Sequence, residues 1–116
     1  YPQLAATAVT DRAPELGRRW TNSFWLLGTG QGAGAGLAEA LAPLRREGRI
    51  GDTVAMVSVA DAFGIELANG MRPAMQRAGF RLTYDRTYPV GTQDTAPIMA
   101  EAARGNPAVF AACRYP

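Results

Sequence analysis

Short apolar runs of strand length alternate with longer amphipathic segments along most of the chain. Residues 53–59 form a continuous apolar and β-branched run, typical of a strand buried on both faces of a parallel sheet. Residues 64–78 place apolar side chains at helical spacing, and Gly79 follows as a stop signal. The whole pattern predicts strands at 4–9, 23–27, 53–59, 80–87 and 108–112, and helices at 36–47, 64–78 and from an Asp94 cap to residue 103.

This alternation predicts an α/β fold. Strands separated by helices of about ten to fifteen residues form βαβ units, whose strands are parallel and whose helices cover the sheet. We therefore expect a parallel sheet flanked by helices in a Rossmann-like, three-layer arrangement. Pro43 lies inside the first predicted helix, where a proline costs about 3 kcal/mol, so the helix is expected to kink there.

The composition is that of a globular protein and excludes several kinds of site. Of the 116 residues, 47% are hydrophobic and 19% charged, which is enough apolar material for a core. The net charge is +2 and the twelve cations, all arginine, are scattered, so no nucleic-acid partner is expected. Without histidine, the chain lacks the commonest general base and the commonest metal ligand. The single cysteine, Cys113, excludes an intrachain disulfide.

A glycine-rich run at residues 28–36 has the form of a nucleotide-binding motif. Gly28, Gly30 and Ala33 satisfy G-x-G-x-x-G/A between a predicted strand and a predicted helix. In dinucleotide-binding folds such glycines let backbone N–H groups approach a pyrophosphate. The fingerprint also needs an acid about twenty residues further on, whereas the next predicted strand ends later, at Asp61. We therefore favour a close-packed helix start over a nucleotide site.

The remaining polar candidates have structural roles as their simplest interpretation. Asp61, Glu66, Asp85 and Asp94 could pair as carboxylates, but turn and capping roles are favoured because no pattern brings them together. Ser58 lies within a strand rather than at a nucleophile elbow, so it is expected to pack. Cys113 lies in a buried strand, where cysteine is usually inert.

Three motifs occur in a fixed order in the second half of the chain. They are VSVADAFG at residues 57–64, YPVGTQD at 88–94 and NPAVF at 106–110. The first contains D-x-[FY]-G after a buried strand, and the second matches Y-P-x-G-T-x-D. In this order and spacing the chain resembles type I periplasmic solute-binding proteins, in particular the branched-chain amino-acid (Leu/Ile/Val) binding family of ABC transporters.

The resemblance also divides the chain. Residues 2–16 resemble the last strand and following loop of the family's first lobe, and residues 23–29 resemble the strand that crosses the hinge. Residues 1–29 are therefore expected to be the end of the first lobe with the hinge-crossing strand. Residues 30–116 are expected to be the first part of the second ligand-binding lobe. This covers only the middle of the family's full length, so an internal segment is expected.

The function implied by the resemblance is binding rather than catalysis. Members of the family hold a small solute between two lobes that close about a hinge. The expected protein is the periplasmic or other extracytoplasmic solute-binding component of an ABC transporter. Its ligand would be an amino acid or a related small carboxylate, its partner a membrane permease, and it would need no cofactor or metal.

Four ligand contacts are carried over from the family by position. Ala8 and Thr10 would bind a carboxylate from the first lobe, through backbone N–H and hydroxyl groups. Phe63 falls where the second lobe presents an aromatic ring, commonly tyrosine, and it keeps the ring without the hydroxyl. Arg114 falls where another aromatic is common, and its guanidinium favours a ligand with an additional acidic group over leucine. A solvated surface role for Arg114 is the alternative.

Two other functions stay open at this point. The glycine run supports a fragment of a Rossmann-type NAD(P)-dependent oxidoreductase, and binding of a pyrophosphate there would favour that enzyme over a solute-binding protein. A sensor or transcription regulator built on the same lobe is the third possibility, because output domains could lie outside this sequence.

Overall fold

Strands and helices alternate throughout the part of the chain that this computed structural model describes, residues 1–114. In chain order the elements are β1 (Gln3–Ala5), α1 (Ala13–Arg19), β2 (Ser23–Trp25), α2 (Gly30–Arg46), β3 (Thr53–Val59), α3 (Ala62–Arg77), β4 (Arg81–Tyr88), α4 (Ala96–Ala103) and β5 (Val109–Cys113). The predicted strand at 53–59 is reproduced residue for residue, and α3, β4 and β5 lie within two residues of their predicted bounds.

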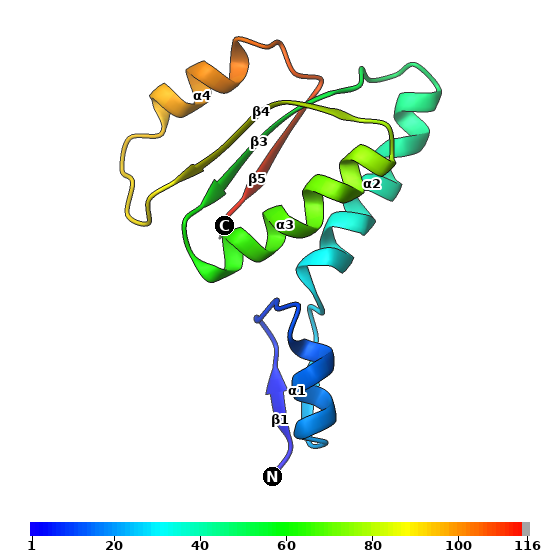
Figure 1. Cartoon of the computed structure of the whole chain (residues 1–116), viewed down its shortest axis with the longest axis vertical. Coiled ribbons are helices and arrows are strands. Elements are labelled where there is room, and N and C mark those ends of the chain that lie inside the picture. The colour runs from blue at the N-terminus through cyan, green and yellow to red at the C-terminus, as the bar shows by residue number, and fades with distance from the viewer. Residues whose placement is uncertain (115–116) are drawn as a thin grey trace.

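The main sheet has three parallel strands in the order β4-β3-β5. Thr53 of β3 is paired with Arg81 of β4, and Ser58 of β3 with Cys113 of β5. Figure 1 shows α4 on one side of this sheet and α2 and α3 on the other. The α/β class and the parallel sheet flanked by helices are therefore confirmed.

The core lies between β3 and α3. Val54 and Met56 of β3 and Met75 of α3 are completely buried, as expected for a central strand covered on both faces. Ser58 is also buried, and its hydroxyl is 3.0 Å from that of Thr87 on β4. The expected packing role of Ser58 is confirmed, because this cross-strand hydrogen bond satisfies a hydroxyl inside the core.

Helix α2 begins at Gly30, six residues before the predicted start, and continues past Pro43. The Thr29 hydroxyl caps it by accepting a hydrogen bond from the Gly32 N–H at 3.0 Å. Each glycine inside a helix costs about 1 kcal/mol relative to alanine, so local propensity alone predicts a later start. The helix nevertheless begins at Gly30, because its first turns pack against α3.

Glycines bring α2 and α3 into backbone contact. A β-carbon at Gly30 would lie 2.6 Å from the Glu66 carbonyl oxygen, and one at Gly34 would lie 2.7 Å from the Gly70 carbonyl carbon. A β-carbon at Gly70 would in turn overlap the Gly30 carbonyl. The glycine run is thus the close-packed helix start that the sequence favoured.

The N-terminal segment, residues 1–29, forms a separate two-stranded parallel sheet. Strand β1 covers only Gln3–Ala5, so the predicted strand at 4–9 is wrong beyond Ala5. Its partner β2 has only three residues, and Gly28 then turns the chain with a φ of 71°. A strand cannot extend beyond the partner that satisfies its backbone groups.

Helix α1 was not predicted at all. Pro14 in its first turn, Glu15 near its start and two arginines in its last turn are helix signals that the short stretch carried.

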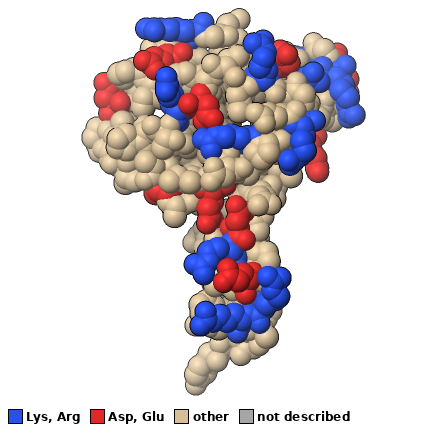
Figure 2. All heavy atoms as spheres, viewed as in Figure 1, with Lys and Arg blue, Asp and Glu red and all other residues tan. Residues whose placement is uncertain are grey.

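The N-terminal segment projects from the rest of the molecule (Figure 1). The molecule measures 50 × 36 × 18 Å with a radius of gyration of 15.8 Å, whereas a compact domain of this length has about 13 Å. Figure 2 shows acidic and basic side chains interspersed over the face it displays. The division into lobes at residue 29 stays a prediction.

Candidate functional site

The turn between β3 and α3 places Phe63 at the carboxyl edge of the main sheet. Asp61 caps α3 by accepting a hydrogen bond from the Gly64 N–H at 2.7 Å, so its expected capping role is confirmed. Gly64 packs so closely on β3 and β5 that a β-carbon would overlap the Val59 carbonyl oxygen. These contacts hold the first turn of α3 against the strand ends, with Phe63 half-buried.

Residues 7–10 of the N-terminal segment meet this turn. A cavity of about 210 Å³ lies between them, and it is lined by Thr7, Ala8, Val9, Thr10, Ala62, Phe63 and Glu66. Three of the four predicted ligand contacts, Ala8, Thr10 and Phe63, therefore line one cavity. Side chains reach it from two units of the chain, the N-terminal segment (residues 1–29) and the part that contains the main sheet. The two groups of lining residues lie more than 50 positions apart in the sequence.

The donors of Thr10 already have partners. Its hydroxyl donates to Glu66 Oε1 at 3.1 Å, and its backbone N–H donates to the Gly28 carbonyl at 3.2 Å. The Asp11 N–H donates to Glu66 Oε2 at 3.1 Å. Glu66 thus belongs to the site, whereas the sequence favoured a turn or capping role for it. Its position one turn after Phe63 was the available signal.

Arg114 follows the end of β5 at the same carboxyl edge, because Cys113 is paired with Ser58 near the end of β3. It lines a different cavity of about 230 Å³ together with Val59, Tyr88, Gly91, Thr92 and Thr95. A narrower recess of about 60 Å³ adjoins it under α4, where Ile98, Met99 and Phe110 provide an apolar wall. The structure places Phe63 and Arg114 at one edge but in two cavities.

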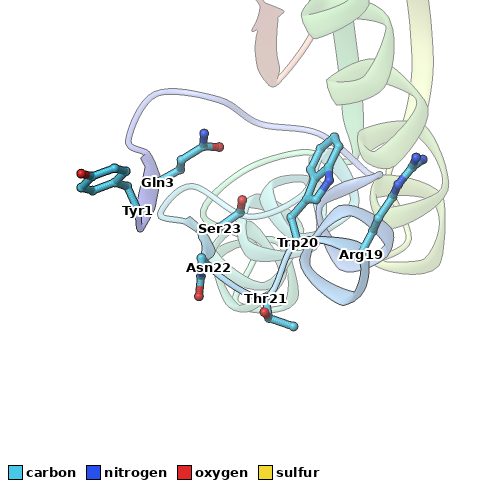
Figure 3. Close-up of a pocket in the computed structure, with 7 residues that line it drawn as sticks. All are labelled: Tyr1, Gln3, Arg19, Trp20, Thr21, Asn22 and Ser23. Carbon is cyan, nitrogen blue, oxygen red and sulfur yellow. The ribbon is translucent and has the colours of Figure 1, made fainter.

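A larger recess of about 540 Å³ lies at the opposite end of the N-terminal segment. It is formed where β1 and β2 begin and α1 ends, and Figure 3 shows that its labelled side chains diverge instead of facing a common point. Ligands of open α/β sheets gather at the carboxyl ends of the strands, and this recess is at the amino ends. The smaller cavity at Thr10 and Phe63 is therefore the better candidate.

Two ionisable side chains outside these cavities, Arg72 and Asp85, pair with each other, and a third, Cys113, is buried. Arg72 of α3 donates to both oxygens of Asp85 on β4, at 2.6 and 3.1 Å, and the hydrogen bond to Asp85 raises the Arg72 pKa. Burial raises the pKa of the Cys113 thiol, which agrees with an unreactive cysteine. Within residues 1–114, no group of three or more cysteine or acidic side chains could hold a metal ion. No helix in the same range is long and apolar enough to cross a membrane.

The nucleotide-binding alternative loses its structural context. In a dinucleotide-binding unit the strands before and after the glycine-rich helix start lie in one sheet. Here β2 belongs to the two-stranded sheet and β3 to the three-stranded sheet. The glycines at positions 30 and 34 contact α3, so the structure does not favour the oxidoreductase.

The chain has the fold of type I periplasmic solute-binding proteins. It matches a crystal structure from Silicibacter pomeroyi, assigned to branched-chain amino-acid ABC transport, at 18% identity and a TM-score of 0.77, covering 98% of this chain and 30% of that one. A solute-binding protein of an ABC transporter from Rhodopseudomonas palustris BisB5, in complex with 3,4-dihydroxybenzoic acid, matches at 16% identity and 0.70, covering 95% and 28%.

A third match is an ABC transporter substrate-binding protein from Desulfitobacterium hafniense in complex with Leu, at 17% identity and a TM-score of 0.65, covering 95% and 31%. At such identities the three matches show the fold. The chain spans only about three tenths of each of these proteins. No protein-family model matches the chain, and no curated protein sequence does.

Proposed function

We propose that this chain is a segment of the solute-binding component of an ABC transporter, and that it binds a solute without catalysing a reaction. The cavity at Thr10 and Phe63 carries the proposal. Two units of the chain meet there at the carboxyl edge of the main sheet, and a clamp that closes on a small solute needs such an arrangement. The fold, shared with ABC transporter binding proteins, supports the same role.

The ligand we propose is an amino acid or a related small carboxylate. Leu and 3,4-dihydroxybenzoic acid, which two of the similar structures contain, both carry a carboxylate. The Thr10 hydroxyl and the backbone of Ala8 offer hydrogen bonds for such a group, and Phe63 offers an aromatic surface. Arg114, at a second cavity on the same edge of the sheet, would favour a ligand with a further acidic group.

The partner and location follow from that role. A solute-binding protein works outside the cytoplasm and delivers its ligand to a membrane permease, so both are part of the proposal. In this role the chain catalyses no reaction. The glycine run then serves only to pack α2 against α3.

Calorimetry on the full-length protein containing this chain, with L-leucine and 3,4-dihydroxybenzoate as probes, tests the proposal. In a Glu66→Ala background, where the Thr10 hydroxyl has no internal carboxylate partner to give up, Thr10→Val should weaken the bound carboxylate by about 1.5–3 kcal/mol, roughly 10–150-fold, because it removes a charge-assisted hydrogen bond. Thr21→Val is the matched control, since Thr21 is exposed and far from this cavity. Unchanged affinity in Thr10→Val would contradict the site, and absence of binding to any carboxylate would contradict the ligand class.

A further inference from the structure

Glu66 joins the N-terminal segment to the helices of the main sheet. Its two carboxylate oxygens each accept one hydrogen bond at 3.1 Å, from the Thr10 hydroxyl and from the Asp11 N–H. The Asp11 carboxylate in turn accepts a hydrogen bond from the Gln31 N–H at the start of α2, also at 3.1 Å. Residues 10 and 11 are therefore held at the starts of both α2 and α3.

The donors that Glu66 occupies are the kind that a ligand carboxylate takes. A hydroxyl and a neighbouring backbone N–H together bind the two oxygens of one carboxylate, and Glu66 is itself a carboxylate bound in this way. The residues lining this cavity include Glu66 and no arginine. A second carboxylate entering the cavity would find these donors occupied by Glu66, and its charge would be repelled by the charge of Glu66.

We propose that Glu66 is an internal competitor for the ligand carboxylate. In this arrangement its side chain occupies the donors of residues 10 and 11, and it must withdraw before a ligand carboxylate can take them. The inference rests on the proposed function, because that function makes Thr10 a ligand contact. Glu66 thereby lowers the affinity for carboxylates and couples ligand entry to release of the N-terminal segment from α3.

The direction in which ligand affinity changes when Glu66 is removed separates this role from a purely structural one. If Glu66 only holds the two units in a binding-competent arrangement, its removal weakens binding. If Glu66 competes with the ligand, its removal strengthens binding while loosening the unliganded protein. Glu66→Gln keeps the size of the side chain but loses its charge and one acceptor oxygen, and Glu66→Ala removes both acceptors.

The experiment uses the full-length protein and two measurements. Hydrogen exchange without ligand should be faster at residues 8–12 in both Glu66 variants than in the wild type. Calorimetry with L-leucine and 3,4-dihydroxybenzoate should show about tenfold tighter binding of the carboxylate that the wild type binds, which corresponds to about 1.4 kcal/mol. Glu39→Gln, which makes the same charge change on an exposed face of α2, should alter neither measurement.

The possible outcomes distinguish the competitor role of Glu66 from a purely structural role. Faster exchange together with tighter binding supports the competitor. Unchanged exchange at residues 8–12, or equal or weaker binding in the Glu66 variants, overturns it and leaves the proposed function standing. Failure of the wild type and of both variants to bind either probe overturns the proposed function and the competitor role together.

Discussion

A methyl group added at Gly34 would meet backbone atoms of α3. A β-carbon there would lie 2.7 Å from both the Gly70 carbonyl carbon and the Met71 nitrogen, whereas ordinary contacts begin at 3.4 Å. Backbone atoms cannot rotate out of the way, so Gly34→Ala must push α2 and α3 apart by roughly 0.7 Å or distort one of them. Overpacking of this kind costs about 1–3 kcal/mol.

Gly36→Ala is the matched control, because nothing lies within 4 Å of a β-carbon at that position of the same helix. Both variants gain about 1 kcal/mol of helix propensity, so this gain cancels when they are compared. The difference in the free energy of unfolding should therefore be about 1–3 kcal/mol in favour of Gly36→Ala. Urea unfolding followed by far-UV circular dichroism measures it. Equal stability of the two variants would refute the close packing of α2 on α3.

Three further outcomes are expected. Burial raises the Cys113 pKa, so the folded state holds the thiol proton more tightly than the unfolded state does. The free energy of unfolding should therefore be independent of this thiol below pH about 8.5 and should decrease as the pH rises above it. Cys113→Ala should reduce that decline, measured by urea unfolding at a series of pH values. Calorimetry with NAD(P) should show no binding tighter than about 100 μM, since the glycines pack on α3. The isolated 116-residue chain should self-associate through the cross-strand neighbours Leu4 and Phe24, which are 64% and 56% exposed. In sedimentation experiments the double change Leu4→Ser/Phe24→Ser should reduce this association, and Val90→Ser, on an exposed loop, should not.

The main sheet could be predicted because its signals are local. A run such as residues 53–59, apolar at nearly every position, is stable as a strand only where both faces are covered, and this implies a parallel sheet with helices on each side. The start of α3 was predictable to within two residues for a similar reason. Asp61 supplies the cap from within the same turn, and no distant residue is needed.

Element boundaries depended on distant partners. The run at 4–9 is apolar enough for a longer strand, but β2 offers only three residues for pairing. The glycines at the start of α2 disfavour a helix by themselves, yet they form one because Gly70 of α3 allows the two backbones to touch. Helix propensity and hydrophobic periodicity describe residues that are close in the chain, so they predict neither the end of β1 nor the start of α2.

The candidate site shows the same division. The resemblance to the solute-binding family was sufficient to select Ala8, Thr10 and Phe63, which line one cavity in the folded chain. Only the tertiary structure shows that Arg114 lines a different cavity and that the Thr10 hydroxyl donates to Glu66. That hydrogen bond joins residues 56 positions apart, and it exists because the N-terminal segment docks on the start of α3. Docking is decided by the shapes and donors of two separate units, and no pattern within either unit encodes it.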